Sequence, residues 1–432
     1  MPPLAYATYS DVWEQVAAAG RHDLNLDVWA AGWRYLSLTT LCLEAAEAAQ
    51  LRQCTRAFSR LLDRAVDGIL ADPAWWPALA WPRPAIELAR QEPAHPGGQA
   101  SLFGRFDCLL DRHGTWRIIE YNADTPSGAR EATGLEPALA RRQPGLRAPS
   151  RQLRPHLVGT LLERIAGHER PVRLVGIVAC HSWLEDIAQA TWLARQLQAA
   201  GQPAIVGDVT DLEVLGQRVA VRGRPIDALY RFYPLEALYR SPTFAELCEA
   251  ASGRRLLLLN GLRGFLAQSK LCLAWLWAHR RQLGAGARGT LERHLPATYL
   301  VREPEAAALA RTQRVVVKHV NGREGDSVVF GETLDAAGWE ARRLDGAYVV
   351  QQAVDSPPLE DVTVDDWRAQ VQVIGGRSAC VGAFAIGGRF AGCYSRLDGP
   401  ITSSRACYVA TLVQPEPRPG PGSRTDGDGR QR

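Results

Sequence analysis

The 432-residue sequence lacks the signals that mark a secreted protein, a membrane protein or a zinc-binding domain. Its nine cysteines occur singly, with no CxxC pair and no spacing typical of a metal finger. No apolar run is long enough to span a bilayer, and the first residues lack the charged and apolar segments of a signal peptide. We therefore expect a cytoplasmic protein with reduced, mostly buried thiols and no membrane partner.

The charge distribution gives no sign of a nucleic-acid partner. The formal net charge is only +4, and the arginines are spread along the chain. Short basic clusters at residues 141–142 and 279–281 are typical of solvated helix faces. The sequence shows no internal repeat, and its length predicts about two or three domains, or one large enzyme with lobes.

The first 150 residues are predicted to be a helical region that ends in a β-hairpin. Helices are expected up to about residue 91, with a capped start at residues 11–14. Apolar residues recur at helical spacing over residues 37–62. Another helix is expected at residues 131–140, and residues 141–154, rich in proline and arginine, are interpreted as a linker.

Residues 151–260 are predicted to form a second unit built on an α/β sheet. Strands are expected at residues 172–180, 203–209 and 228–232, with a helix at residues 184–199 between the first two. This alternation of strand and helix indicates parallel strands with helices packed on their faces.

Residues 261–414 are predicted to form a third part, and residues 415–432 a disordered tail. A helix is expected to begin near Ser269. Strands are expected at residues 315–320, 328–330, 347–354, 371–374, 379–386 and 389–394. Glycine pairs at residues 375–376 and 387–388 predict turns between the last three strands.

The hairpin, at residues 103–128, is predicted to carry charge on one face. If the four residues around Gly114 form the loop, pairing puts Asp107 opposite Glu120 and Arg105 opposite Asn122. The side-chain period of two then places all four on one face of the hairpin. Opposed carboxylates repel unless a cation lies between them, and these oxygen ligands suit Mg²⁺. The alternative is a solvated strand face with a charge-balancing arginine.

A glycine-rich segment follows the predicted strand VVVKHV. Gly322 and Gly325 let backbone amides approach a polyphosphate, and Lys318 and Arg323 add positive charge. The segment is not a Walker A loop, because the lysine precedes the glycines instead of following them. A plain turn with a lysine reaching to solvent is the alternative. Combined with the carboxylate face and a late arginine, Arg396, the segment indicates Mg-nucleotide chemistry with phosphoryl transfer.

Five motifs, GRFD, IIEYNADTP, VVVKHVNGREG, VVQQ and YSRLDGPIT, resemble the glutathionylspermidine synthase family of ATP-grasp carbon–nitrogen ligases. The resemblance runs from about residue 5 to 413, in order and at compatible spacing. It covers the synthetase part alone, without the cysteine-peptidase amidase domain. It implies an α/β fold with α+β lobes, in which nucleotide lies between two ATP-grasp lobes at residues 261–414. Residues 151–260 would be a pre-ATP-grasp-like substrate lobe.

The resemblance also implies an activity and its cofactors. ATP would phosphorylate a substrate carboxylate with the help of Mg²⁺, and an amine would attack the acyl phosphate to give an amide, ADP and phosphate. Glutathione and spermidine are the default acid and amine. The partners expected are thus small molecules, and a homodimer is left open.

Roles for individual residues follow from the resemblance alone. The implied catalytic residues are Arg105, beside the reacting carboxylate, and Arg396, at the transferring phosphoryl group. The implied metal ligands are Asp107, Glu120 and Asn122. The implied ATP contacts are Lys270, Lys318, Gly322, Arg323, Glu324 and Gly325, with an adenine hinge at Gln351, Gln352, Ala353 and Val354. The implied substrate contacts are Thr125, Ser127, Glu185 and Asp186.

The sequence departs from the family pattern in the substrate region. The stretch around residues 230–236 carries Phe and Ala where members that make glutathionylspermidine have threonines. Glu185 and Asp186 replace a paired glutamate, and residues 361–376 add length before the last strands. Another peptide acid or amine is therefore an open alternative. So are a non-catalytic nucleotide-binding relative and a kinase that stops at phosphoryl transfer.

Overall fold

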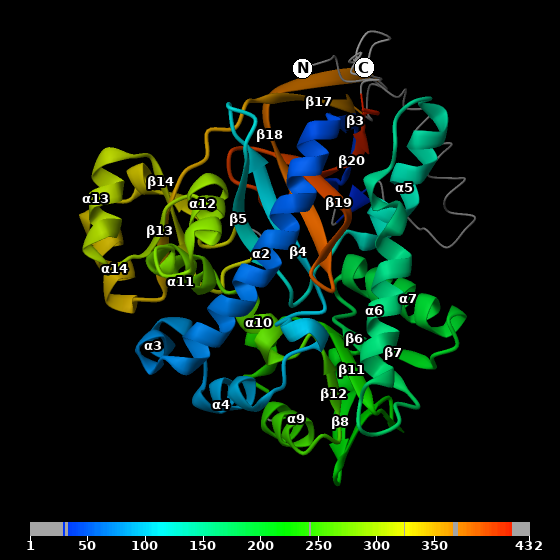
Figure 1. Ribbon diagram of the computed structural model, residues 1–432. Coiled ribbons are helices and arrows are strands. Elements are labelled where there is room, and N and C mark those ends of the chain that lie inside the picture. Colours follow the sequence, from blue (N-terminus) through cyan, green and yellow to red (C-terminus); the bar gives the residue numbers. More distant parts are fainter. Residues whose placement is uncertain (1–28, 31–32, 242, 324, 366–369, 417–432) are drawn as a thin grey trace, which may run out of the picture.

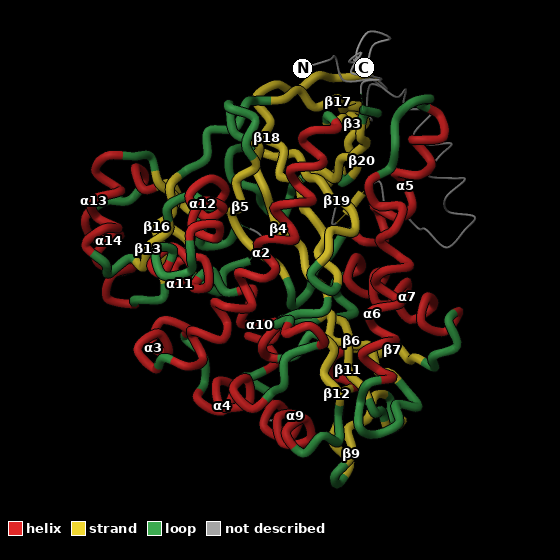
Figure 2. The backbone as a smooth tube through the Cα atoms, in the orientation of Figure 1, coloured by secondary structure: helices red, strands yellow, loops and turns green. Residues whose placement is uncertain are grey.

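The computed structural model describes residues 29–30, 33–241, 243–323, 325–365 and 370–416. The predicted helix start at residues 11–14, Glu324 and almost all of the predicted tail lie outside these ranges. Within them the chain forms three larger sheets with helices packed between and around them (Figures 1 and 2). The mixed α/β fold with lobes, predicted from the sequence, is confirmed.

The central sheet brings together segments from both ends of the chain. Its strand order is β3-β20-β19-β18-β4-β5, with β17 also paired to β18, and only β3 and β20 run parallel. The strands are β3 (Leu36–Leu43), β4 (Phe103–Leu110), β5 (Trp116–Asn122), β17 (Leu359–Asp365), β18 (Gln370–Ile386), β19 (Arg389–Asp398) and β20 (Cys407–Val413).

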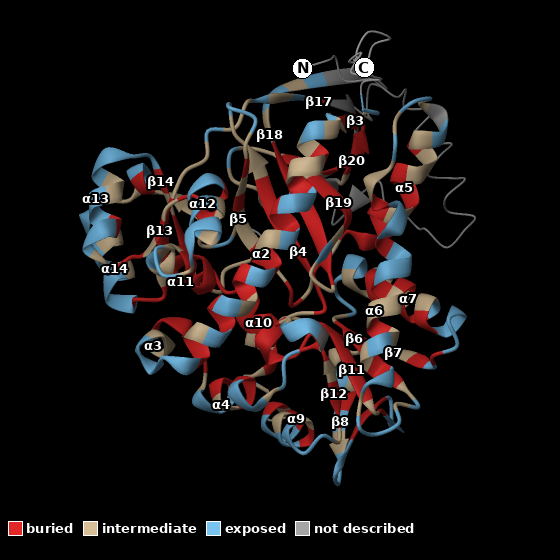
Figure 3. Cartoon of the chain, viewed as in Figure 1, coloured by how far each residue is buried: buried red, intermediate tan, exposed pale blue. Residues whose placement is uncertain are grey.

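Helices cover the two faces of this sheet and divide the core. The long helix α2 (Ala45–Ala71) packs on one face, where Phe106 and Ala383 are buried. Helices α5 (Ala129–Arg142) and α6 (Leu153–Ala166) pack on the other face, where Phe384 and Tyr394 are buried. Because successive strand residues alternate between faces, the odd-numbered residues of β4 point toward the face of α5 and α6. Figure 3 shows the buried strands of this sheet in red.

A second sheet is fully parallel, as predicted for the α/β unit. Its order is β12-β11-β6-β7, from Leu257–Leu259, Ala228–Phe232, Val175–Ala179 and Ala204–Asp208. The helix α7 (Leu184–Ala199) has the predicted bounds and packs on β6 and β7. Smaller elements around this sheet are α8 (Leu235–Leu238), α9 (Thr243–Ser252), β8 (Leu212–Leu215), β9 (Arg218–Val221) and β10 (Arg224–Pro225).

The third sheet is antiparallel and belongs to a lobe with its own small core. Its order is β13-β16-β14-β15, from Thr298–Leu300, Tyr348–Gln352, Val315–His319 and Val329–Phe330. Helices α13 (Pro304–Thr312) and α14 (Ala336–Asp345) flank it, and Figure 3 shows much of their surface exposed. The remaining elements are β1 (Trp29–Ala30), β2 (Trp33–Arg34), α3 (Trp76–Leu79), α4 (Arg83–Gln91), α10 (Leu262–Gln268), α11 (Leu271–His279) and α12 (Ala285–His294).

Three local predictions were wrong. The helix predicted over residues 37–62 begins only at Ala45, because the threonine-containing segment Leu36–Leu43 pairs with β20 as a strand. The turn predicted at residues 375–376 is absent, since β18 continues through it and pairs with β17 and β19. The predicted linker at residues 141–154 is partly helical, and its Arg147 forms a bridge to Val413.

Two further observations concern the cysteines and the length of the apolar helices. All nine cysteines are free thiols, five of them buried. No helix in the described ranges is long and apolar enough to cross a membrane.

Candidate functional site

The hairpin of β4 and β5 has the predicted register. Arg105 pairs with Asn122 and Asp107 with Glu120, as expected. The connecting loop, however, has five residues, 111–115, and a β-bulge adds Ile119 to β5 beyond it. The longer loop and the extra residue offset each other, so the four polar side chains keep their predicted pairing.

A cleft of about 740 Å³ is lined by the central sheet and the third sheet. The predicted site residues that line it are Asp107, Glu120, Lys318, Gly325, Gln351, Gln352, Ala353, Val354 and Arg396. These residues come from four separate stretches of the chain. The fold therefore brings the proposed metal, phosphate and adenine contacts to one cavity.

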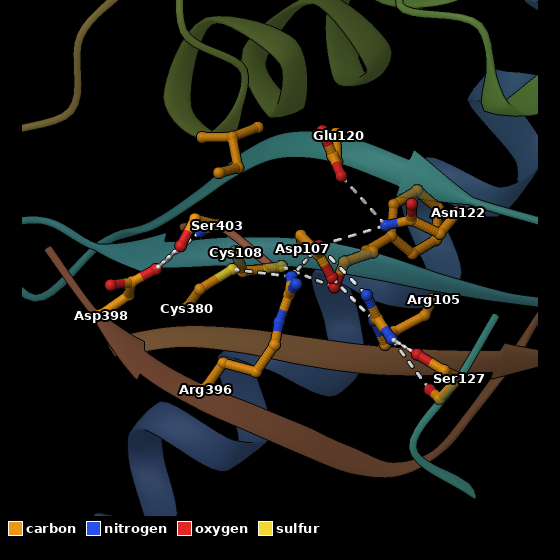
Figure 4. Close-up of polar contacts among 12 residues, drawn as sticks. Arg105, Asp107, Cys108, Glu120, Asn122, Ser127, Cys380, Arg396, Asp398 and Ser403 are labelled. Carbon is orange, nitrogen blue, oxygen red and sulfur yellow. Dashed lines mark hydrogen bonds and ion pairs between the residues drawn. The ribbon is translucent and has the colours of Figure 1, made fainter. Parts of the chain in front are cut away.

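Asp107 lies at the floor of this cleft, between two arginines (Figure 4). Its Oδ1 accepts a hydrogen bond from Arg105 Nε at 2.8 Å, and its Oδ2 accepts one from Arg396 Nη2 at 2.5 Å. Burial would raise the pKa of Asp107, but the charges of Arg105 and Arg396 outweigh it and lower that pKa to about 2. Asp107 is therefore ionised and holds both arginines in place.

Glu120 and two lysines form a second charged group, of which Glu120 and Lys318 line the cleft and Lys270 does not. Lys270 Nζ lies 3.3 Å from Glu120 Oε2 and donates a hydrogen bond to the Gly322 carbonyl at 2.8 Å. Lys318 Nζ donates to Gln351 Oε1 at 2.8 Å. Burial lowers the pKa of Lys318 to about 8, although the charge of Glu120 acts in the opposite direction. Both lysines thus lie where an anionic ligand would find positive charge.

The donor set at the hairpin fits a magnesium ion. The Asn122 amide nitrogen Nδ2 bridges Asp107 Oδ2 at 3.1 Å and Glu120 Oε1 at 3.3 Å. The three side chains therefore converge, and rotation of the amide would present its oxygen instead. Among described residues no group of three His, Cys, Asp or Glu forms a metal site. Two carboxylates and one amide oxygen suit Mg²⁺, which keeps its other positions for water and phosphate.

The glycine loop, defined as residues 320–323 and 325–328, packs against several parts of the protein. Asn321 donates to the Leu79 carbonyl at 2.7 Å. A side chain at Gly325, whose φ is +74°, would meet the Thr402 carbonyl at 2.5 Å. Arg323 points away from the cleft and forms ion pairs with Asp124 and Glu236. Of the described residues predicted as phosphate contacts in the loop, Gly325 lines the cleft, whereas Gly322 and Arg323 do not.

The predicted substrate contacts lie on the side of the α/β unit. Thr125 Oγ1 accepts a hydrogen bond from Arg323 at 3.0 Å, and the Ser127 carbonyl accepts one from Arg105 at 2.8 Å. Glu185 and Asp186 occupy the first turn of α7. Burial raises the pKa of Tyr35, and the charges of Glu131, Tyr394 and Glu185 raise it further.

Sequence reasoning missed several charged and aromatic residues of the site. Asp124 lies inside the motif IIEYNADTP, so its position next to the predicted metal ligands was a usable signal. Tyr394 precedes Arg396 by two residues, and its ring lies 5.0 Å from the Arg105 guanidinium carbon. Cys380, cross-strand from Arg396, lines the cleft as well. Arg231 and Glu236 come from the α/β unit and carried no local signal.

Among the solved structures that resemble this chain, one with a TM-score above 0.5 supports the fold. A glutathione synthetase-like effector from Globodera pallida, in its apo form, covers 94% of this chain and 98% of its own, with 10% identity and a TM-score of 0.62. A putative γ-glutamylcysteine synthetase from Methylobacillus flagellatus covers 83% and 86%, with 10% identity and a TM-score of 0.45. The ATP-grasp ligase PsnB with minimal precursor, Mg and ADP covers 56% and 88%, with 14% identity and a TM-score of 0.28.

A comparison with curated protein sequences finds no match. A profile described as glutathionylspermidine synthase preATP-grasp matches residues 10–414. Such a family supports ATP-dependent joining of a carboxylate to an amine as the general chemistry. Because the profile covers nearly the whole sequence, the chain belongs to the glutathionylspermidine synthase preATP-grasp family.

Proposed function

We propose that the protein is an ATP- and Mg-dependent ligase that forms an amide bond through an acyl phosphate. Its acid is a peptide-like carboxylate, with glutathione as the default, and its amine is spermidine by default. The observation that carries this proposal is the cleft, which collects two carboxylates, an amide and several cations between two sheets.

Each charged group of the cleft has a role in this proposal. Asp107, Glu120 and Asn122 hold magnesium, which supplies charge neutralisation at the phosphate oxygens. Lys270 and Lys318 hold the phosphates of ATP. These two lysines are buried, with 4% and 5% exposure, so their charge acts in a site of low dielectric.

The two arginines beside Asp107 act at the reacting groups. Arg105 is anchored by Asp107 and by the Ser127 carbonyl, so its guanidinium is fixed before substrate binds. Arg396 lines the cleft, and its buried Nε has no hydrogen-bond partner among the residues that the structure describes. In the proposal Arg105 orients the substrate carboxylate, and Arg396 meets the negative charge that develops during phosphoryl transfer.

The hinge residues bind the base. Gln351 to Val354 line the cleft at the end of β16, and the Ala353 amide donates to the Arg314 carbonyl at 2.9 Å. This bond ties the hinge to the residue before β14, the strand that carries Lys318. Gln351 and Gln352 of the hinge and Lys318 are therefore on neighbouring strands of one sheet.

The experiment that tests the proposal is a phosphate-release screen of candidate acids crossed with amines, with the product mass as the second readout. Phosphate release that needs both an acid and an amine, with an amide product, is the expected result. ADP formation with an acid alone would favour a kinase, and no turnover with any pair would favour a non-catalytic nucleotide-binding relative.

A second candidate is a ligase of the same mechanism that uses a different acid or amine. Phe232 is fully buried in the α/β sheet, in the stretch where glutathionylspermidine-forming members have threonines. A buried phenyl ring offers no hydroxyl to a peptide substrate. The screen therefore includes peptide acids other than glutathione and diamines shorter and longer than spermidine.

A further inference from the structure

The strongest feature outside the proposed chemistry is a buried ion-pair cluster around Asp124. The Asp124 cluster comprises Asp124, Arg231, Glu236 and Arg323. It joins three parts of the molecule: the end of the hairpin, the α/β unit and the glycine loop. It lies outside the cleft that the ATP proposal uses.

Arg323 uses all three of its guanidinium nitrogens in this cluster. Its Nη2 donates to Asp124 Oδ2 at 2.5 Å and to Glu236 Oε2 at 2.8 Å. Its Nε donates to the other oxygen of Glu236, and its Nη1 donates to Thr125 Oγ1 at 3.0 Å. The pair with Glu236 is two-pronged, which is the strongest geometry available to arginine.

Asp124 depends on Arg323 for part of its charge compensation. Its side chain is fully buried, and its other charged partner is Arg231. Its Oδ2 also accepts a hydrogen bond from the Leu235 amide at 3.0 Å. Burial opposes ionisation of Asp124, but Arg231 and Arg323 outweigh it and keep its pKa below the ordinary value. Withdrawal of Arg323 would therefore leave a buried carboxylate with weaker compensation.

A phosphate contact by Arg323 would require this arrangement to break. The guanidinium would have to leave Asp124, Glu236 and Thr125 together, and two carboxylates would lose a partner. Lys318 lines the cleft and donates to the neutral Gln351 Oε1, so it supplies positive charge there without the loss of an ion pair. Loop residues can instead reach the nucleotide through their backbone, since Gly325 lines the cleft.

We propose that Arg323 is a positioning residue that latches the glycine loop onto the substrate side of the molecule, through Asp124 and Glu236, and is not an ATP ligand. The latch links the loop to Thr125, one residue from Asp124 and a predicted substrate contact. Closure of the glycine loop then depends on the arrangement of the residues that hold Arg323, namely Asp124, Thr125 and Glu236. This inference rests on the proposed function only in that the closed loop covers a nucleotide.

The test is amide hydrogen exchange of the peptide covering residues 319–330, measured by mass spectrometry on the full chain without nucleotide. Arg323→Ala and Glu236→Gln should each speed exchange of this peptide by about tenfold, because each breaks a partly buried ion pair. Arg323→Lys should give an intermediate rate, since lysine keeps the charge but not the two-pronged contact. Wild-type exchange in both Arg323→Ala and Glu236→Gln would overturn the latch.

The matched control is an arginine–glutamate pair on the surface of the same lobe. Arg343 and Glu340 on α14 form an ion pair with side chains 61% and 48% exposed. Arg343→Ala should leave exchange of residues 319–330 unchanged. Equal acceleration by Arg343→Ala and Arg323→Ala would show a general effect of lost charge and would also overturn the proposal.

Binding of Mg-ATP separates the latch from a phosphate contact. If Arg323 acts as a latch, Arg323→Ala and Glu236→Gln should change the dissociation constant for Mg-ATP in the same direction. The double variant should then differ little from either single variant. In a phosphate contact, Arg323→Ala alone weakens binding. Because the exchange experiment needs no nucleotide, a protein that binds no ATP would refute the proposed function while leaving the latch tested.

Discussion

Asp107 and Asp124 are both buried, both ionised and both held by two arginines, yet their surroundings differ. Asp107 is held by Arg105 on β4 and Arg396 on β19, two strands of one sheet that are separated by β18, and Asp107 lines the cleft. Asp124 is held by Arg231 and Arg323, which come from different parts of the molecule. In our proposals, the same charge arrangement serves a reactive site where it opens to a cavity and a structural latch where it joins segments.

Removing the charge of Glu120, which pairs with Lys270 and with neither arginine of Asp107, is the largest expected perturbation of this comparison. Glu120 is more exposed than Asp107, and its loss leaves the two arginines of Asp107 paired. Glu120→Gln should lower turnover by about a thousandfold or more, since a metal contributes several kcal/mol to the transition state. Steady-state kinetics with circular dichroism as a folding check measure this. Turnover within tenfold of wild type would rule out Glu120 as a metal ligand.

Arg396→Ala tests the arginine that lines the cleft, where we propose that it meets developing charge. Loss of a transition-state donor should cost about a hundred- to a thousandfold in turnover with little change in ATP affinity. Arg396→Lys should recover only part of this, because lysine lacks the planar fork. Turnover and the nucleotide dissociation constant are measured for both variants. Equal losses in both quantities would make Arg396 a ground-state contact.

Asp107→Asn tests how much the charge of Asp107 stabilises the fold. Two opposed carboxylates alone would gain from losing one charge, but here Asp107 neutralises two arginines. The depressed pKa, about 2 against 3.8, corresponds to a stabilisation of about 2 kcal/mol. This stabilisation is present above pH 4 and is lost as the pH falls toward 2.

Denaturant unfolding of wild type and Asp107→Asn across this pH range measures the effect. The variant should be less stable at pH 7, and the gap should narrow as the pH falls from 4 to 2. A gap that stays constant over this interval would show that the carboxylate charge does not stabilise the fold. Arg343→Ala, on the exposed face of α14, serves as a control with little expected change.

Loss of the Lys318 charge should have the smallest effect, a change in affinity for Mg-ATP that depends on pH. Its lowered pKa of about 8 means that its charge is lost between pH 7 and 9. Affinity for Mg-ATP should therefore fall by up to about tenfold over that interval, since the loss of charge weakens the contact with phosphate. In Lys318→Gln affinity should be lower at pH 7 and nearly independent of pH. Titration calorimetry at constant ionic strength decides between these outcomes.

The difference between Asp107 and Asp124 also shows which parts of the site the sequence could predict. The pairing of Asp107 with Glu120 was predictable because both lie in one hairpin, 13 residues apart, where alternation fixes the face. The Asp124 cluster was not, because Arg323 is 199 residues from Asp124 and 87 from Glu236. No local spacing brings such residues together, and only the packing of the loop on the α/β unit does.

Local pattern also failed where tertiary pairing decided the element. Residues of β3 repeat apolar side chains in a way that fits a helix, but β20 offers an edge for pairing. The glycines at 375–376 fit a turn, but β18 runs through them, with a β-bulge in its pairing with β17 at this point, and β19 pairs with β18 from Ser378 onward. By contrast, α7 was predicted with its bounds, because its strands and turns flank it closely in sequence.

The central claim is that the cleft lined by Asp107 and Glu120 binds a magnesium–nucleotide complex. Calorimetric titration of ATP into the wild-type protein, with magnesium and then with chelator, tests it most directly, and Glu120→Gln serves as the matched variant. The account predicts that magnesium tightens ATP binding at least tenfold in wild type and has little effect in Glu120→Gln. Equal affinity with and without magnesium in the wild-type protein would contradict it.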